Sequence, residues 1–262
     1  MTQAPRATFE AHGKVGVVRL NDPTALNAMS LSMAEDLDRA LSRAFAESRA
    51  MILTGAGRGF CAGAKLSEGT IPLDWTGRPD MGAGLETHIN PLLLRLKRSP
   101  IPWISAVRGP AAGVGCSLAL AADLIVASET ASFIQAFAKV GLAPDGGASW
   151  LLARAIGRPR AMEMMLLGEK VSASQALEWG MINRVVSDDT LDSEALALAQ
   201  RLAEGPASLA LIREAAWHGL DHSWEEALPF EREGQRRAGQ TRDHVEGVAA
   251  FLEKRPAQFT GA

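Results

Sequence analysis

The chain has 262 residues, a formal net charge of −3 and a hydrophobic content of 47%. A chain of this length can bury a substantial core, and its composition is that of a globular protein rather than a disordered one. The small negative charge argues against nucleic acid as the main partner, because a phosphate backbone calls for a basic face.

Two further features of the composition indicate where the protein resides. The sequence has two cysteines, Cys61 and Cys116, each within a small apolar run, which favours packing roles and a reducing compartment. Residues 1–6 lack the apolar core of a signal peptide, and no run of roughly 18 apolar residues could span a bilayer. We therefore expect a cytoplasmic protein without a membrane partner.

The first hundred residues alternate between strand and helix patterns. Two short strands, 7–10 and 15–20, are predicted to form a hairpin, and Ser30 is predicted to cap an amphipathic helix. A strand at 50–54 follows. Residues 67–84 have little periodicity and predict a long loop, which is either a lid over a binding site or a solvated connection. A helix is predicted at 85–97.

Two glycine-rich corners follow strands, one at 55–66 and the other at 109–123, where a strand at 103–107 runs into a helix of small residues. Glycines allow tight turns and close approach to a ligand, and a helix N-terminus offers free N–H donors, so such a corner can hold an anion or an oxyanion. Close packing of a buried helix explains the small residues equally well. Two common nucleotide-binding motifs are absent from the sequence. Phe60 replaces the third glycine of a dinucleotide fingerprint, and no lysine follows at the spacing of a phosphate loop.

Helices dominate the second half of the chain. Short strands are predicted at 123–127 and 131–134, and a helix opens at 143–147 and runs through Ile156, with Asp145 as a candidate N-cap. Further helices are predicted at 161–167, 172–178, 191–204, 206–217, 224–237 and 243–253, with one more strand at 182–186. The repeated strand-strand-helix order favours an α/β fold built as an irregular superhelical stack.

Together the two corners, with Phe60-Cys61-Ala62-Gly63 and Gly113-Val114-Gly115, resemble the enoyl-CoA hydratase/isomerase superfamily, which has the crotonase fold. The resemblance runs nearly end to end and includes 144–147, 177–182 and the C-terminal series from Glu246 to Phe259. Through 144–147 and the ending 258–261 the chain is similar to the ring-epoxide isomerase branch. The resemblance implies a superhelix of ββα turns over residues 1–200 and a C-terminal helical region, 201–262, that trimerises and covers CoA.

The same resemblance implies an acyl-CoA substrate, with CoA carried as part of that substrate, no other cofactor, no metal, and a homotrimer or dimer of trimers. Two oxyanion-hole donors fall on the backbone N–H groups of Ala64 and Val114, although the family usually has glycine at position 114. The resemblance also implies contacts to CoA. Main-chain groups of the first corner and of the segment before Ser30 flank the adenine and the pantetheine, and an aromatic residue near the C-terminus closes over CoA. These expected CoA contacts are Ala25, Ala28, Ala62 and Phe259.

Hydratases of the superfamily use two glutamates, and the matching positions here hold Ser117 and Phe137. Addition of water needs a group that deprotonates water and a proton source for carbon, so efficient hydration is disfavoured.

Asp145 matches the catalytic acid/base of the dienoyl and epoxide isomerase branches. The alternative role as an N-cap would bind its carboxylate to backbone N–H groups and lower its pKa.

The expected function is therefore that of an acyl-CoA isomerase that moves a proton, a double bond or a ring epoxide next to the thioester. An enoyl-CoA hydratase with an unrecognised acid and a catalytically silent acyl-CoA-binding protein stay open as alternatives.

Lys65 stands where many members of the superfamily have aspartate, and it is expected to be ion-paired or solvated, or to contact a CoA phosphate. Glu86 is expected on an exposed helix face, and His218 and His222 are expected to be solvated or packed rather than metal ligands.

Overall fold

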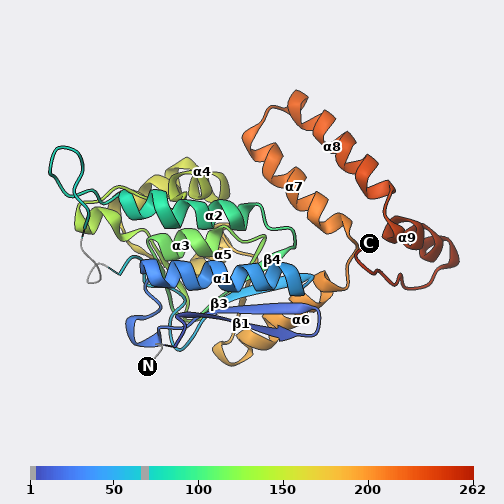
Figure 1. Ribbon diagram of the computed structural model, residues 1–262, viewed down its shortest axis with the longest axis horizontal. Coiled ribbons are helices and arrows are strands. Elements are labelled where there is room, and N and C mark those ends of the chain that lie inside the picture. Colours follow the sequence, from blue (N-terminus) through green and yellow to red (C-terminus); the bar gives the residue numbers. More distant parts are fainter. Residues whose placement is uncertain (1–3, 66–70) are drawn as a thin grey trace.

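The computed structural model describes residues 4–65 and 71–262, so the start of the expected loop at Ser67 lies outside the described residues. Strands and helices alternate from the N-terminus, and a series of helices follows (Figure 1). The strands are β1 (Ala7–His12), β2 (Val15–Leu20), β3 (Ala50–Gly55), β4 (Trp103–Val107), β5 (Pro110–Ala112), β6 (Leu124–Ser128), β7 (Ser132–Ile134), β8 (Lys170–Ser172) and β9 (Arg184–Val186). The helices are α1 (Leu31–Glu47), α2 (Asn90–Lys97), α3 (Val114–Leu120), α4 (Ala148–Leu167), α5 (Ala173–Glu178), α6 (Leu191–Ala203), α7 (Ser208–Asp221), α8 (Trp224–Gly239) and α9 (Arg242–Glu253).

The larger sheet has six strands in the order β1-β2-β3-β4-β6-β9. The β1–β2 pair is the predicted antiparallel hairpin, and the other neighbours are parallel. Alternate residues of each strand face opposite sides: Val17, Ile52 and Ile104 pack with α6, while Val18 and Leu53 join the main core under α1. A parallel sheet buried on both faces explains the nearly continuous apolar runs of β3 and β4.

Ser30 caps α1 as predicted, since its hydroxyl accepts a hydrogen bond from the backbone N–H of Met33 at 3.1 Å. The predicted helix at 85–97 forms, and its first turn, Leu85–Ile89, is a π-helix. Glu86 is exposed, as expected.

A smaller sheet joins β5, β7 and β8. Sequence reasoning did not predict β5 or β8, because each has three residues and neither has room for an alternating pattern. β5 is nevertheless important for the site, since it lies inside the second glycine corner and joins β4 to α3.

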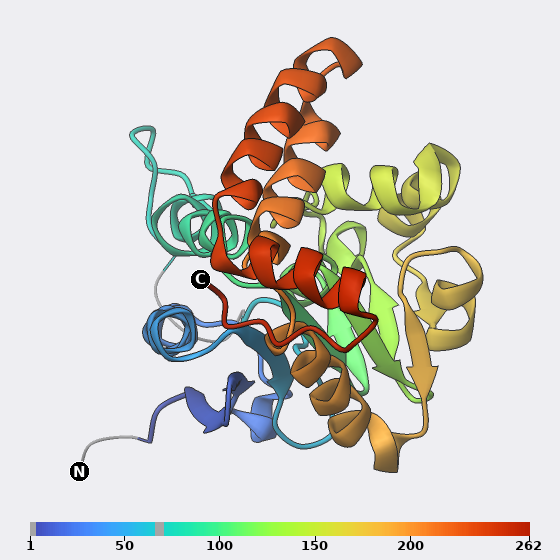
Figure 2. The ribbon, with the colours of Figure 1, turned by 90° about the vertical axis from the view of Figure 1, so that its right-hand side faces the viewer.

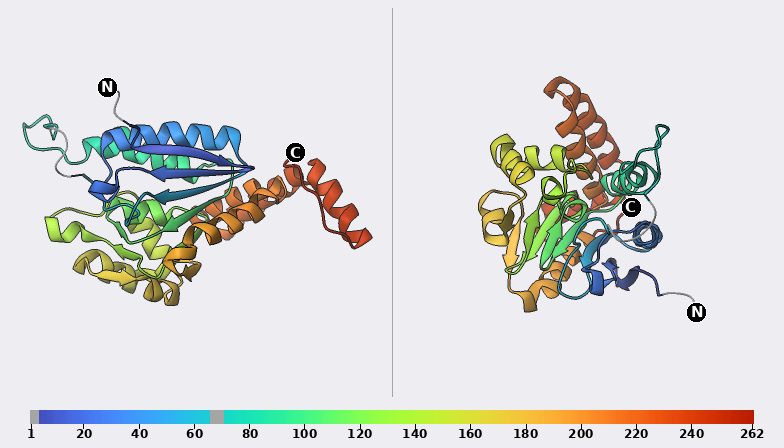
Figure 3. Two further views of the ribbon diagram at one scale, coloured as in Figure 1. Left: turned by 90° about the horizontal axis from the view of Figure 1, so that it is seen from below. Right: turned by 90° about the vertical axis from the view of Figure 1, so that its left-hand side faces the viewer.

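The C-terminal helices project from the core. Figure 2 shows α7 and α8 lying side by side and extending away from the two sheets, and Figures 1 and 3 show α9 at the end of this region farthest from the sheets. Arg213 of α7 is buried, and its Nε lies 2.7 and 2.6 Å from the two carboxylate oxygens of Asp123 in the core. The domain boundary at residue 200 stays a prediction. In the described residues, no helix is both long enough and apolar enough to cross a bilayer.

Candidate active site

The two glycine corners pack directly against each other. Cys61 of the first corner pairs with Ala111 of β5: the backbone N–H of Cys61 donates to Pro110, and Ala112 donates to the carbonyl of Cys61 at 2.9 Å. Gly115 must be glycine at this contact, because a Cβ there would lie 2.3 Å from the carbonyl oxygen of Cys61. The small residues therefore serve close packing and bring both corners to one place.

Both cysteines are fully buried, which confirms the packing role predicted for them. Desolvation raises the pKa of the Cys61 thiol to about 11 and that of the Cys116 thiol to about 12. Neither thiol is therefore a nucleophile at neutral pH.

The backbone of Ala64 presents a free N–H group. Met29 forms a parallel bridge with Ala64, in which Met29 donates to Gly63 at 2.7 Å and Lys65 donates to Met29 at 2.9 Å. In such a bridge the N–H of the central residue points to the opposite edge. Within the described residues, the N–H of Ala64 makes no hydrogen bond.

Val114 supplies a second free N–H group. It is the first residue of α3, and the N–H groups of a first helical turn have no partner within their own helix. The preceding Gly113 is fixed by donation from its N–H to Ile134 of β7 at 2.8 Å. As for Ala64, the N–H of Val114 makes no hydrogen bond in the part of the chain that the structure describes.

Ala64, Val114 and Asp145 line one cavity of about 760 Å³. This volume lies in the range of ordinary small-molecule sites. Apolar side chains form most of its wall, including Met29, Leu31, Ile71, Met81, Leu85, Ile89, Phe137, Val140 and Leu142. The described part of the expected loop therefore borders this cavity rather than only solvent. It also contributes Asp80, a second carboxylate that sequence reasoning did not single out.

Asp145 is not the N-cap of α4. Gly147 is the capping residue, with a left-handed φ of 80°, and α4 has no side-chain cap. Oδ1 of Asp145 is buried without a hydrogen-bond partner among the described residues, and desolvation raises the pKa of this carboxyl to about 6. The N-cap hypothesis predicts a bonded carboxylate with a lowered pKa, so it is wrong.

The two positions that hold glutamates in hydratases lie beside Asp145 and the second corner. Ser117 is fully buried, and its hydroxyl donates to the backbone oxygen of Asp145 at 3.1 Å. Phe137 is buried against the second corner, with a ring carbon 3.5 Å from the place where a Cβ of Gly113 would stand. Neither side chain has a group that titrates near neutral pH, so neither can replace a glutamate as general acid or base.

Three of the four expected CoA contacts are brought together. Ala62 donates from its N–H to Leu26 at 3.0 Å, so the first corner lies against the segment that contains Ala25 and Ala28. Sequence reasoning missed Asn27, the fully buried residue that fixes this arrangement. Its side chain donates to the carbonyls of Ala56 and Gly59 and accepts from the N–H of Asp22.

Phe259 lies elsewhere. It packs against Gly247 of α9, and its carbonyl accepts a hydrogen bond from Arg49, which precedes β3. Ala62 lies beyond the other end of β3, and a six-residue strand separates its two ends by roughly 17 Å. Within one chain, Phe259 therefore does not join the other three residues.

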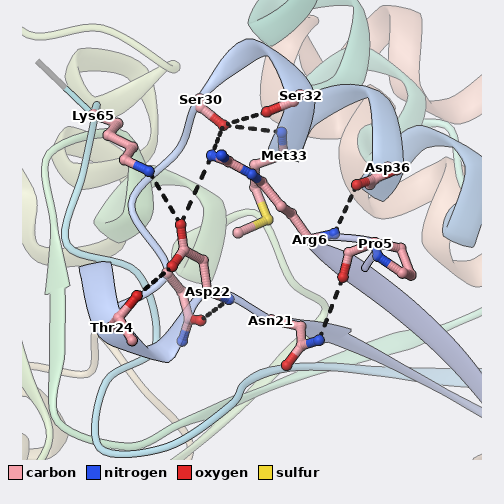
Figure 4. A network of polar contacts seen from close by, with 11 residues as sticks. Pro5, Arg6, Asn21, Asp22, Thr24, Ser30, Ser32, Met33, Asp36 and Lys65 are labelled. Carbon is pink, nitrogen blue, oxygen red and sulfur yellow. Dashed lines mark hydrogen bonds and ion pairs between the residues drawn. The ribbon is translucent and has the colours of Figure 1, made fainter. Parts of the chain in front are cut away.

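A polar network borders the cavity at Lys65 (Figure 4). The Lys65 ammonium lies 3.2 Å from Oδ2 of Asp22, and the Arg6 guanidinium donates to the hydroxyl of Ser30 and lies 3.8 Å from the same carboxylate. The structure thus has the ion-paired lysine that was one of the expectations, with its side chain held between the first corner and the start of α1. A contact between Lys65 and a CoA phosphate stays a prediction.

Two free N–H donors and a desolvated carboxylate thus line one largely apolar cavity, and groups of these types can bind an oxyanion and exchange a proton. The family model described as "Enoyl-CoA hydratase/isomerase" matches residues 10–262, and the chain belongs to this family.

Similar proteins include isomerases and hydratases. The chain is 46% identical over 257 residues to the 1,2-epoxyphenylacetyl-CoA isomerase of Escherichia coli, covering 96% of this chain and 97% of the relative. It is 41% identical to a probable enoyl-CoA hydratase of Rhodobacter capsulatus, covering 97% of each. Among solved structures, an enoyl-CoA hydratase subunit from Geobacillus kaustophilus matches with a TM-score of 0.90 and 36% identity, covering 98% of each chain. The predicted crotonase-type α/β fold with a helical C-terminal region is confirmed.

Proposed function

We propose that this protein is an acyl-CoA isomerase in which Asp145 moves a proton next to the thioester. The observation that carries the proposal is the desolvated Asp145 carboxylate in the same cavity as the N–H groups of Ala64 and Val114. The name of the Escherichia coli relative, an isomerase of an acyl-CoA, supports it.

In the proposed reaction, the thioester oxygen of a β,γ-unsaturated acyl-CoA accepts hydrogen bonds from Ala64 and Val114. The Asp145 carboxylate takes a proton from the α carbon, and the electron pair of the broken C–H bond forms an enolate. The carboxyl then returns the proton to the γ carbon, and the double bond comes to lie between the α and β carbons. One preorganised N–H donor can lower such a barrier by roughly 3 kcal/mol.

The environment of Asp145 suits both steps. With its pKa raised to about 6 by desolvation, the carboxyl is largely ionised at pH 7 and yet is a stronger base than an exposed aspartate. The two proton transfers change no oxidation state, so the proposed reaction needs no cofactor beyond the CoA of the substrate.

Hydration is the second candidate, because the Rhodobacter capsulatus relative is a probable enoyl-CoA hydratase. A hydratase needs a second group that activates water. The family's two glutamate positions hold Ser117, whose hydroxyl is engaged by the backbone of Asp145, and Phe137. Asp80 is the remaining carboxylate among the described residues of the cavity wall, and its Oδ1 accepts a hydrogen bond from the N–H of Gly82.

A panel of CoA thioesters in deuterated water separates the candidates. We expect the protein to convert trans-3-hexenoyl-CoA to the 2-enoyl isomer and to leave crotonyl-CoA largely unhydrated, as measured by mass spectrometry. Asp145→Asn should abolish both isomerisation and deuterium uptake at the α carbon. Undiminished turnover in this variant would overturn the assignment, and binding without turnover across the panel would favour a silent acyl-CoA-binding protein.

We also propose that the helices α7, α8 and α9 mediate assembly into homotrimers or dimers of trimers. They enclose a groove of about 840 Å³ with a largely apolar wall that includes Ile212, Val248, Phe251, Leu252 and Phe259. Phe251 is 82% exposed, which is unusual for a phenylalanine unless another surface covers it. Because Phe259 is remote from Ala62 in its own chain, its proposed contact with CoA would be made to a neighbouring subunit.

Light scattering after size-exclusion chromatography tests this assembly. Phe251→Asp should shift the protein to a monomer, because a charge would then face the apolar groove of the neighbour. Leu167→Asp on α4 is the control, since Leu167 is also exposed but lies outside the groove. A wild-type protein that is monomeric at micromolar concentration would contradict the proposal.

A further inference from the structure

Ser117 connects the two halves of the candidate site. It is the fourth residue of α3, the helix whose first residue carries the N–H of Val114. Its hydroxyl lies 3.1 Å from the carbonyl oxygen of Asp145 and 3.5 Å from the carbonyl oxygen of Gly113. A hydroxyl has one proton to donate, and the contact with Asp145 has the better distance.

The turn that contains Asp145 also packs directly on α3. Gly146 has a φ of +61°, and a Cβ there would lie 3.0 Å from Cβ of Ser117 and 3.2 Å from Cγ2 of Val114. Only glycine fits this place without a shift. The carbonyl of Asp145 accepts a second hydrogen bond, from Ala148 of its own turn, whereas the bond from Ser117 joins the turn to α3.

From these contacts we propose that Ser117 is a positioning residue, which sets the distance between the oxyanion donor of Val114 and the carboxylate of Asp145. The inference rests on the proposed isomerase function, because it assigns Ser117 a role in that reaction. Ser117 is fully buried and does not line the cavity, so its role is exerted through the backbone of Asp145. The position that holds a glutamate in hydratases would thus have a different role in this chain, where Ser117 would orient the carboxylate of Asp145.

Position matters more for the second proton transfer than for the first. The carboxyl must reach the α carbon to remove a proton and the γ carbon to return it, while the thioester oxygen stays fixed between the two N–H donors. A displacement of about 1 Å can lower a rate by about 100-fold. A carboxylate that shifts along α3 can still exchange the α proton and yet fail to deliver it to the γ carbon.

The test compares two measurements on trans-3-hexenoyl-CoA in deuterated water: the rate of isomerisation and the rate of deuterium uptake into recovered substrate. Ser117→Ala removes the hydroxyl and little volume. We expect kcat for isomerisation to fall by about 10-fold to about 100-fold, with KM changed less than about twofold, and the ratio of exchange to isomerisation to rise severalfold.

Ser105→Ala is the matched control. Ser105 is also fully buried, and its hydroxyl has no hydrogen-bond partner among the described residues. It lies in β4 and does not line the cavity, so this variant should keep the wild-type ratio and kcat. Ser117→Cys, which retains a weak donor, should lie between Ser117→Ala and the wild type, and thermal unfolding checks that each variant is folded.

The outcomes separate the two claims. If Asp145→Asn is inactive while Ser117→Ala keeps the wild-type ratio and kcat, the role of Ser117 is overturned and the proposed function stands. If Asp145→Asn keeps full activity, the proposed function fails, and the role of Ser117 fails with it.

Discussion

Nζ of Lys65 lies 3.2 Å from Oδ2 of Asp22, which joins the residue after the Ala64 donor to the segment before α1 (Figure 4). Burial by itself would raise the pKa of the Asp22 carboxyl, but hydrogen bonds from Thr24 and Lys65 outweigh it and the pKa is lowered. Both side chains of the pair are less than a quarter exposed. Water therefore screens this ion pair less than it screens a surface pair.

A double-mutant cycle measures the coupling between Lys65 and Asp22. Lys65→Met should destabilise the fold, because it leaves the Asp22 carboxylate with the more distant Arg6 as its charged partner. Asp22→Asn should destabilise it for the reciprocal reason, and the double variant should lose less than the sum of both. We expect a coupling of about 1 kcal/mol in the free energy of unfolding, measured by urea denaturation. Additive effects would show that the two side chains act independently.

The pH dependence of catalysis should report the ionisation of Asp145. In the proposed reaction the carboxyl must be ionised to take a proton, and desolvation raises its pKa to about 6. kcat/KM for trans-3-hexenoyl-CoA is therefore expected to be level above about pH 7 and to fall about tenfold per pH unit below about pH 6. A profile that stays level down to about pH 4.5 would contradict a raised pKa for this carboxyl. Ser105→Ala should give the wild-type profile.

The same group should make the fold less stable as pH rises. An aspartate has a pKa near 3.8 in the unfolded chain, and the folded value is higher, so folding favours the protonated form. The stability due to this group is fully present below about pH 3.8 and is lost as pH rises through about 6. Asp145→Asn, which is neutral at every pH, should therefore raise the melting temperature at pH 8. The difference from the wild type should shrink as pH falls toward 4, and an equal gain at both pH values would contradict this explanation.

Much of the fold could be predicted from local patterns. Strands such as β2 and β3 carry long apolar runs, and α1 shows both a helical period and a capping serine, so tertiary contacts only reinforce what the local sequence favours. The three-residue strands β5 and β8 have no such period. They exist because β7 offers an edge on each side, which is a property of the assembled chain.

The candidate site, too, was predictable only in part. Resemblance pointed to Ala64, Val114 and Asp145, and they do line one cavity. Whether Asp145 caps α4 depends on the left-handed turn at Gly146 and Gly147, which begins α4 too late for Asp145 to cap it. An aspartate before two glycines is compatible with either role, so the sequence pattern alone could not decide. Likewise, the hydrogen bond from Ser117 to Asp145 joins residues that are 28 positions apart, so no local sequence pattern indicates it.

The ion pair between Arg213 and Asp123 should determine whether the C-terminal helices stay attached to the core. Arg213 also donates to the carbonyls of Leu96, Lys97 and Ser99, the end of α2 and the residues after it. Desolvation outweighs the attraction of Arg213, so the pKa of the Asp123 carboxyl is raised even in the intact pair. Removal of the cation would leave a buried carboxylate that is costly to ionise.

Arg213→Met should therefore lower the free energy of unfolding by about 3 to 5 kcal/mol at neutral pH. It should also expose the 204–207 segment between α6 and α7 to thermolysin, because α7 loses its buried anchor. Combining it with Asp123→Asn should recover part of the lost stability, since the amide carries no charge into the core. Arg232→Met on α8 is the control, because Arg232 is exposed and its ion pair is with the adjacent, half-buried Glu233 on the same helix. Equal proteolysis of both arginine variants would show that α7 is held by its apolar contacts and not by this ion pair.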